Sequence, residues 1–267
     1  MPYLAANGIQ LSYQRSGSGE PVLLIMGSSA AGHVWTLHQT PALHKAGYET
    51  VVFDNRGIPP SDAPPGKYTL PELVADTKAL IEELDLAPCR IVGTSMGAMI
   101  AQELAIGWPD LVRCAVLMAT RARADAVRLA QAAADRALIE SGIKLPAKYE
   151  AVETVMKMLS PTTLNNDDAI AGWLEVFELA GEASTTASGQ VWVDLLQDRR
   201  DALRTISAPC RVIGFADDLI TPSHLAAEAA DAIPNCDFVE IPRCGHLGYL
   251  ERPDEVNAAI IEFLDKN

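Results

Sequence analysis

Basic residues are scarce in this sequence of 267 residues. Lys and Arg number 21 against 35 Asp and Glu, which gives a formal net charge of −14 at pH 7. A field of that sign repels phosphate backbones and anionic lipid headgroups, so we expect neither nucleic-acid binding nor attachment to a membrane. The charge does not identify a substrate, because it acts on solubility and long-range association rather than on chemistry.

Long apolar runs and paired cysteines are also missing. Strictly apolar runs such as Ala98–Ala101 are far shorter than the roughly 20 residues that a membrane-spanning helix requires. The first ten residues have neither the basic segment nor the apolar segment of a secretory signal. The five cysteines are an odd number without a C-x-x-C pair, which argues against a disulfide framework. We therefore expect a cytoplasmic protein with reduced thiols, present as a monomer or a homodimer.

What the sequence does contain is a regular alternation of short apolar runs and helical patterns. Strands are predicted at residues 22–26, 50–53, 90–92, 114–119, 211–216 and 236–241, and helices at 34–46, 69–84, 96–106, 223–232 and 253–264. Short, continuously apolar strands separated by helices are typical of a parallel sheet that is covered on both faces. The pattern predicts an α/β fold with a doubly wound sheet.

This alternation stops at Thr120. Residues 121–204 are rich in Ala and poor in strand patterns, and they predict several helices. The small residues of Ala180–Gln190 predict a mobile linker. We therefore expect an α/β core formed by residues 1–120 and 205–267, interrupted by a helical cap at 121–204 that covers a pocket.

The most informative motif is the pentapeptide from Gly93 to Gly97, which reads G-T-S-M-G between a predicted strand and a predicted helix. In a G-x-S-x-G motif the serine occupies a tight strand-to-helix turn, and only glycines two residues to either side let the backbones pass. The turn exposes the serine hydroxyl above the N-terminus of the helix, which stabilises developing negative charge. Ser95 is therefore the candidate nucleophile.

A serine nucleophile needs a base, and the base needs a carboxylate to orient it. Of the five histidines, His246 alone lies in a loop between glycines, after the last predicted strand, whereas the others lie in or beside helical patterns. Asp217 and Asp218 follow the strand before it, in the segment Gly214–Pro222. The order Ser, Asp, His along the chain is the one expected for an α/β-hydrolase arrangement.

With these motifs the chain resembles the α/β-hydrolase fold superfamily, in its serine-nucleophile branch, over essentially its whole length. The matching segments are the glycine-led loop after Leu23–Met26, the D-x-R-G segment Asp54–Gly57, the turn at Ser95, the acid loop Gly214–Pro222 and Gly245-His246. The resemblance implies a mostly parallel eight-stranded sheet with the cap inserted after strand six. It also implies a catalytic triad of Ser95, Asp218 and His246.

The resemblance favours Asp218 as the acid, because that acid typically stands four residues before the loop proline. Counting three residues from the loop glycine gives Asp217 instead, and Asp125 remains a third alternative. The oxyanion hole is expected to consist of the backbone amides of Ser28 and Met96. The Met-Gly pair before Ser28 is similar to that of polyketide methylesterases.

A serine at the turn disfavours epoxide hydrolases and haloalkane dehalogenases, which use an aspartate there. The resemblance therefore implies a serine esterase, carboxylesterase-like, that cleaves a small-to-medium apolar ester, thioester or lactone through an acyl-enzyme on Ser95. A cofactor-free perhydrolase (the non-haem haloperoxidase type) or a carbon–carbon bond hydrolase would use the same triad. A ligand-binding protein on a hydrolase scaffold is the alternative from another class.

The expected cap contains large apolar side chains that are candidates for the substrate pocket. These are Met156, Leu159, Trp173, Phe177 and Trp192. No cluster of His, Cys, Asp and Glu has metal-ligand spacing, no G-x-G-x-x-G follows a strand, and no P-loop is present. We therefore expect no metal and no organic cofactor, and a small apolar acyl compound as the only partner.

Overall fold

The structure, a computed structural model, describes residues 2–183 and 187–267. Its centre is an eight-stranded sheet in the order β1-β2-β4-β3-β5-β6-β7-β8. The strands are β1 (Tyr3–Ala6), β2 (Ile9–Gly17), β3 (Glu20–Ile25), β4 (Tyr48–Phe53), β5 (Cys89–Thr94), β6 (Val112–Met118), β7 (Cys210–Phe215) and β8 (Cys236–Ile241). Only β1–β2 and β2–β4 pair antiparallel. The predicted mostly parallel, doubly wound, eight-stranded sheet is therefore confirmed.

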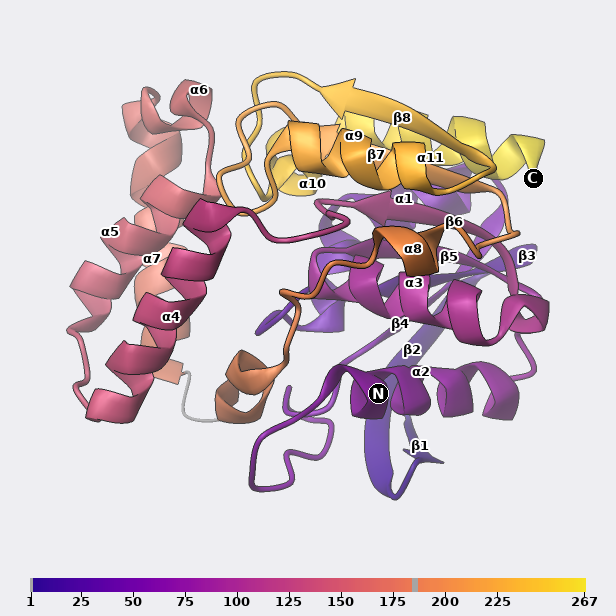
Figure 1. The fold of residues 1–267 in the computed structure, drawn as a ribbon, viewed down its shortest axis with the longest axis horizontal. Helices are drawn as coiled ribbons and strands as arrows, with labels where there is room; N and C mark the ends of the chain where they lie inside the picture. The colour runs from indigo at the N-terminus through magenta and orange to yellow at the C-terminus, as the bar shows by residue number, and fades with distance from the viewer. Residues whose placement is uncertain (1, 184–186) are drawn as a thin grey trace.

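Helices cover both faces of the sheet and bury a separate apolar layer on each (Figure 1). One layer is formed with α2 (Leu70–Glu83), α3 (Met96–Gly107) and α9 (Ser223–Ala232), and the other with α1 (Gln39–Lys45) and α11 (Pro253–Lys266). Strands β5 and β7 are buried along their whole length, which explains why their sequences do not alternate between apolar and polar residues; apart from Arg90, Thr94 and Arg211 they consist of apolar residues and glycine. Helix α2 begins with a capping box, in which Thr69 and Glu72 exchange hydrogen bonds.

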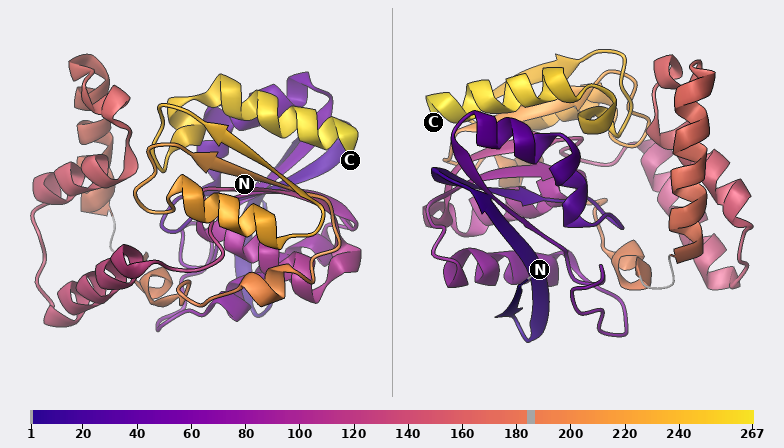
Figure 2. Two further views of the ribbon diagram at one scale, coloured as in Figure 1. Left: turned by 45° about the horizontal axis from the view of Figure 1, so that its top comes forward. Right: turned by 180° about the vertical axis from the view of Figure 1, so that it is seen from behind.

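The connection between β6 and β7 is long and mostly helical, and we call residues 121–204 the insertion. Its helices are α4 (Ala126–Ser141), α5 (Ala147–Met158), α6 (Pro161–Leu164), α7 (Asp167–Ala183) and α8 (Arg200–Leu203), with the 3-10 helix η3 at Ala187–Trp192. Helices α4 to α7 stand apart from the helices that flank the sheet (Figures 1 and 2). The backbone N–H of Arg199 donates to the carbonyl of Ala122 at 2.8 Å, so the insertion leaves and rejoins the core at neighbouring positions.

The described residues of Ala180–Gln190, the segment predicted to be a mobile linker, are helical. Helix α7 continues to Ala183 and η3 begins at Ala187, while residues 184–186 lie outside the described residues. Small residues weaken the helical pattern in the sequence, but Ala is itself the best helix former, so the composition did not exclude helix.

The five cysteines are all unpaired, and four of them are fully buried. Burial raises the pKa of the Cys89 thiol to about 12 and that of Cys114 to about 11, because the thiolate is poorly solvated there. Within the described ranges, no helix combines the length and apolar character needed to cross a membrane.

Candidate active site

Ser95 occupies a strained turn between β5 and α3, with φ 54° and ψ −120°. Its backbone N–H donates to the carbonyl of Met118 at 3.0 Å, which fixes the turn against β6. A Cβ on Gly93 would lie 2.5 Å from the carbonyl oxygen of Gly97, and a Cβ on Gly97 would lie 2.1 Å from that of Ile25. Both contacts are far too short, so the two glycines are sterically required for the turn that presents Ser95.

Ser95, His246 and Asp218 form a continuous chain of hydrogen bonds. The Nε2 atom of His246 lies 3.0 Å from Ser95 Oγ, and its Nδ1 atom lies 2.8 Å from Asp218 Oδ2. His246 and Asp218 are buried at 4% and 3% exposure, whereas Ser95 is partly exposed. The structure thus brings together the three residues that the sequence selected, at the carboxyl end of the parallel strands.

The environment of Asp218 determines which nitrogen of His246 carries the proton. Burial alone would raise the pKa of Asp218, but the charge of His246 and hydrogen bonds from His246 and Thr221 hold it below its ordinary value. A carboxylate only accepts hydrogen bonds, so Nδ1 of His246 is the donor to Asp218. In the neutral ring Nε2 is then the acceptor, and Ser95 Oγ–H donates to it.

Thr221 contacts the Ser95–His246–Asp218 hydrogen-bond network, and the sequence analysis did not identify it. Its hydroxyl donates to Asp218 Oδ2 at 2.6 Å and its backbone N–H to Oδ1 at 2.8 Å. The N–H of Ile220 adds a third bond at 2.7 Å. The sequence did contain a pattern that indicates this contact: a hydroxyl residue lies three positions after an aspartate and immediately before a proline. Such a pattern is typical of a turn in which the aspartate side chain accepts hydrogen bonds from the backbone.

The other two candidate acids have different roles. Asp217 is only partly buried, and its backbone N–H donates to the carbonyl of Cys244 at 3.0 Å. Asp125 is the N-cap of α4, where its carboxylate accepts from the N–H of Arg128 at 2.7 Å. Neither aspartate has a hydrogen bond to His246 among the described interactions, so the geometry selects Asp218.

The two residues predicted for the oxyanion hole lie close to each other, since Ser28 Oγ donates to Met96 Sδ at 3.3 Å. Met96 is the first residue of α3, where the helical pattern leaves amide groups without an intrahelical acceptor. A Cβ on Gly27 would lie 3.1 Å from Ser95 Cβ, so the adjoining peptide to Ser28 passes directly beside Ser95.

A buried glutamine from the insertion holds this loop. The amide oxygen of Gln190 accepts from the N–H of Ser29 at 2.8 Å, and its NH₂ group donates to the carbonyl of Arg56 at 2.7 Å. Ser29 has a φ of 60°, a conformation that a non-glycine residue keeps only when its surroundings fix it. Nothing in the local sequence marks Gln190, because its partners lie more than 130 residues away.

The loop that carries His246 is tied to the insertion through Glu251, at the end of the short helix α10 (Gly248–Glu251). One carboxylate oxygen accepts from the N–H of Gly245 at 2.6 Å. The other accepts from the N–H and hydroxyl of Ser160 at 3.0 and 2.7 Å and from the hydroxyl of Thr163 at 2.6 Å. The residue before His246 and the start of α6 therefore share one carboxylate.

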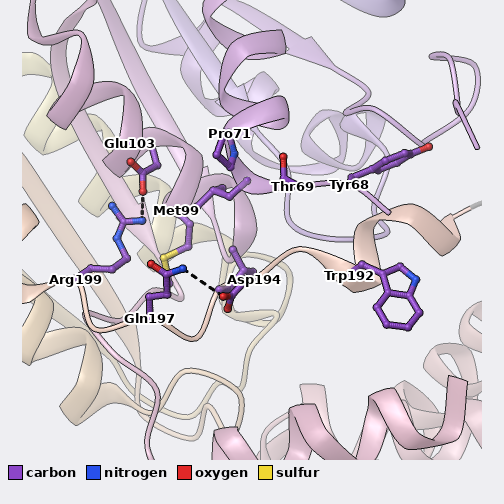
Figure 3. A pocket seen from close by; sticks show the side chains of 11 residues that line it. Tyr68, Thr69, Pro71, Met99, Glu103, Trp192, Asp194, Gln197 and Arg199 are labelled. Carbon is purple, nitrogen blue, oxygen red and sulfur yellow. Dashed lines mark hydrogen bonds and ion pairs between the residues drawn. The ribbon is translucent and has the colours of Figure 1, made fainter. Parts of the chain in front are cut away.

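Two cavities lie where the insertion meets the core. A cavity of about 440 Å³ is lined by Ser28, by residues of α4 and by the return segment, which we define as residues 189–199. A second cavity, of about 400 Å³, lies between the return segment, the start of α2 and α3 (Figure 3). Ion-paired Glu103 and Arg199 form part of its wall. The first cavity is the one that contacts the Ser95 region, through Ser28.

The five side chains predicted for the pocket do not together line either of these two cavities. Met156 is 57% exposed on α5, and Leu159 is buried. Trp173 and Phe177 stack on each other within α7 at 5.6 Å between ring centroids. Trp192 lines the second cavity, and Lys67 Nζ lies 3.5 Å from its ring centroid. Of the two cavities described here, neither is lined by the other four residues, because the docking of α4 and the return segment places different side chains beside Ser28.

In the described part of the chain, no group of three or more His, Cys, Asp or Glu side chains is arranged to hold a metal ion. Ser95, His246 and Asp218 supply a nucleophile, a base and a carboxylate at this site.

Comparison with known proteins agrees with this geometry. The model of the alpha/beta hydrolase family matches residues 22–259. The chain is 46% identical over 256 residues to BpoC of Mycobacterium tuberculosis (strain ATCC 25618 / H37Rv), which is named as a non-heme bromoperoxidase; the match covers 96% of this chain and 97% of that protein. The crystal structure of BpoC has a TM-score of 0.91 at 45% identity, with 96% of each chain covered. The enol-lactonase of Burkholderia xenovorans LB400 has a TM-score of 0.80 at 26% identity, covering 99% of this chain and 100% of that one. The chain therefore belongs to the alpha/beta hydrolase family and is a hydrolase.

Proposed function

We propose that the protein is a serine hydrolase that cleaves a carboxylic ester, thioester or lactone through an acyl-enzyme on Ser95. The observation that carries the proposal is the hydrogen-bond chain from Ser95 Oγ through His246 to Asp218, with distances of 3.0 and 2.8 Å. A hydroxyl is a weak nucleophile, and an adjacent base that is itself oriented by a carboxylate is the arrangement that activates it.

In this mechanism Ser95 Oγ attacks the substrate carbonyl while its proton passes to Nε2 of His246. The amides of Ser28 and Met96 hold the resulting oxyanion. The imidazolium then gives its proton to the leaving oxygen or sulfur as the bond to the carbonyl carbon breaks. Water repeats the sequence: it loses a proton to His246 and attacks the acyl carbon, and the same proton returns to Ser95 as the acid leaves. Asp218 stabilises the imidazolium in both halves.

The insertion acts in this proposal as a cap that encloses the substrate. Apolar side chains of α4 and the return segment form much of the cavity beside Ser28, namely Ala132, Leu138, Ile139, Val191, Val193, Leu195 and Leu196. A volume of about 440 Å³ fits a small-to-medium acyl compound. The substrate that the site favours is therefore a compact acyl compound with a substantial apolar part.

The test is labelling and turnover of the Ser95→Ala variant. The wild-type protein is expected to react with a fluorophosphonate probe and to hydrolyse p-nitrophenyl esters, and the variant to do neither. Ser18→Ala is the matched control, because it makes the same change at an exposed position between β2 and β3. Wild-type esterase activity in Ser95→Ala would refute the assignment of the nucleophile.

Bromoperoxidase-type activity is a second candidate, favoured by the 46% identity to BpoC and by that protein's name. The same acyl-enzyme would be attacked by hydrogen peroxide in place of water, and the resulting peracid would oxidise bromide. Peroxide-dependent bromination of a phenol indicator, measured beside ester hydrolysis and with Ser95→Ala as the blank, separates the two activities.

A further inference from the structure

The cavity beside Ser28 collects positive charge in an otherwise acidic protein. Three arginines line it, Arg121, Arg128 and Arg136, and the only acidic residue among its lining is Asp135. The sequence as a whole has 35 acidic and 21 basic side chains, so the excess of basic side chains around the cavity is opposite in sign to the excess in the whole protein. A cluster of that sign in a partly enclosed, largely apolar cavity concentrates anions.

Arg121 is the most unusual member of the cluster. It follows β6 at the carboxyl edge of the sheet and is only 5% exposed. One terminal nitrogen, Nη2, donates to the carbonyl of Leu195 at 3.0 Å, while its buried Nε has no hydrogen-bond partner. Among the ion pairs of the described residues, none includes Arg121. A buried guanidinium is ordinarily paired with a carboxylate, so Arg121 can still accept an anionic partner.

Arg121 nevertheless remains charged at neutral pH. Burial, and then the nearby charge of Arg128, lower its pKa to about 10, and Asp218 and Asp125 act in the opposite direction. The cost of keeping this charge buried falls when an anion binds beside it.

Arg128 projects from the first turns of α4 into the same cavity. Its side chain is 17% exposed, and the nearest oxygen of Asp135 lies 3.9 Å from its Nη2, at the limit of an ion pair. Asp135 also accepts a hydrogen bond from Gln131 at 2.7 Å. Arg128 therefore has only a weak internal partner, while Arg136, which is exposed, lies at the rim.

We propose that Arg121 and Arg128 form a subsite for a carboxylate on the acyl chain of the substrate. The subsite rests on the proposed serine hydrolase mechanism, and it adds that the preferred ester is anionic at the end remote from the reacting carbonyl. The acyl part stays on Ser95 after the first product has left, so the cavity must accommodate this part throughout the cycle. A guanidinium fork matches the two oxygens of a carboxylate, and two such groups in a partly enclosed cavity provide recognition that apolar contacts do not.

The test compares two esters of equal shape at fixed ionic strength. In p-nitrophenyl hydrogen adipate the acyl chain ends in a carboxylate, and in p-nitrophenyl 6-methylheptanoate an isopropyl group takes its place. We expect the wild type to favour the anionic ester about 10-fold or more in kcat/KM, the range of a well-placed charged hydrogen bond. Arg128→Gln should remove most of that preference, because it takes away one of the two positive charges that recognise the carboxylate.

Three further variants make the result specific. Arg128→Lys should keep part of the preference, since it retains the charge but not the fork. Arg121→Gln should lose it, with a thermal unfolding midpoint to show that this buried position still folds. Arg204→Gln is the matched control, because Arg204 is 63% exposed and forms an ion pair with exposed Asp201; it should keep the wild-type ratio.

The proposal is overturned if the wild type favours the neutral ester, or if its preference for the anionic ester survives in both Arg128→Gln and Arg121→Gln. If the wild type hydrolyses neither ester, the proposed function is at fault, and calorimetric titration with adipate then tests the subsite alone. Saturable binding that weakens about 10-fold in Arg128→Gln supports the subsite. Absent binding, or equal binding in the variant, overturns it.

Discussion

Replacing Glu251 with glutamine perturbs the carboxylate that joins the His246 loop to the insertion while keeping its shape. In the native protein both carboxylate oxygens accept, one from Gly245 N–H at 2.6 Å and the other from three donors of Ser160 and Thr163. A glutamine has one acceptor oxygen and one NH₂ group, so it cannot satisfy both sets. In either orientation an NH₂ group faces a backbone N–H, because both sets contain one.

The size of the effect follows from this count. At least one backbone N–H loses its acceptor, and the remaining bonds change from charged to neutral. Hydrogen bonds to charged groups contribute about 1.5–3 kcal/mol each, so we expect Glu251→Gln to lower the free energy of unfolding by about 2 kcal/mol. For a domain of this size that corresponds to a fall in Tm of about 4–8 °C. Because Gly245 directly precedes His246, kcat should also fall, by about 10-fold, with little change in KM.

Chemical denaturation, thermal unfolding and kcat with a p-nitrophenyl ester measure the three quantities on one preparation. Glu255→Gln is the control, since it makes the same change at an exposed site on α11. If Glu251→Gln unfolds within about 0.5 kcal/mol of the control and turns over at its rate, Glu251 does not position the His246 loop and the reasoning is wrong.

Three other changes test separate parts of the site. Asp218→Asn should lower kcat by about 10⁴-fold, because it favours the wrong tautomer of His246. Because the pKa of Asp218 is lowered in the folded state, its carboxylate stabilises the protein at neutral pH, and this stabilisation is lost as the pH falls through that pKa. The stability of Asp218→Asn should therefore depend less on acid pH than that of the wild type. An unchanged dependence would contradict the assignment. Gly97→Ala should destabilise by about 3 kcal/mol or prevent folding, because its Cβ meets backbone 2.1 Å away, whereas Gly107→Ala in the same helix meets nothing within 4 Å and should be neutral or stabilising. Gln190→Leu should lower the free energy of unfolding by about 2–4 kcal/mol and reduce kcat/KM, since the Ser29 N–H and the Arg56 carbonyl both lose a buried partner; unchanged denaturant midpoints would show that water replaces it.

The sequence was sufficient for those features that depend on local geometry. The turn at Ser95 requires Gly93 and Gly97, because a Cβ at either position would clash with backbone atoms, so the motif was sufficient to predict the turn. His246 could be selected because it lies between glycines in a loop, whereas the other histidines lie in or beside helical patterns, where a histidine ordinarily has a structural role. The buried strands were recognisable because a parallel sheet covered on both faces requires continuous apolar runs.

Features that depend on how distant segments dock could not be derived from the residues alone. Asp217 and Asp218 are neighbours of equal chemistry. The resemblance favoured Asp218, and the physical reason is the path of the loop after β7, which turns Asp218 inward to His246. The predicted pocket residues were chosen for apolar size, yet Met156 lies on the surface, while Arg121 and Arg128 line the cavity instead. Hydrophobicity identifies the residues that are buried somewhere, but the rotation of α4 against the core decides which face meets Ser28.

The buried thiols can be used to detect local and global unfolding of the protein. The thiolate is the nucleophile that attacks an alkylating reagent, and burial keeps the pKa of Cys89 and Cys244 near 12, so the native protein should react slowly. Cys89 lies within β5 of the sheet, whereas Cys244 lies two residues before His246. Pulsed alkylation followed by peptide mass spectrometry therefore distinguishes two events in one sample: detachment of the His246 loop, which exposes Cys244 alone, and opening of the whole sheet, which exposes both.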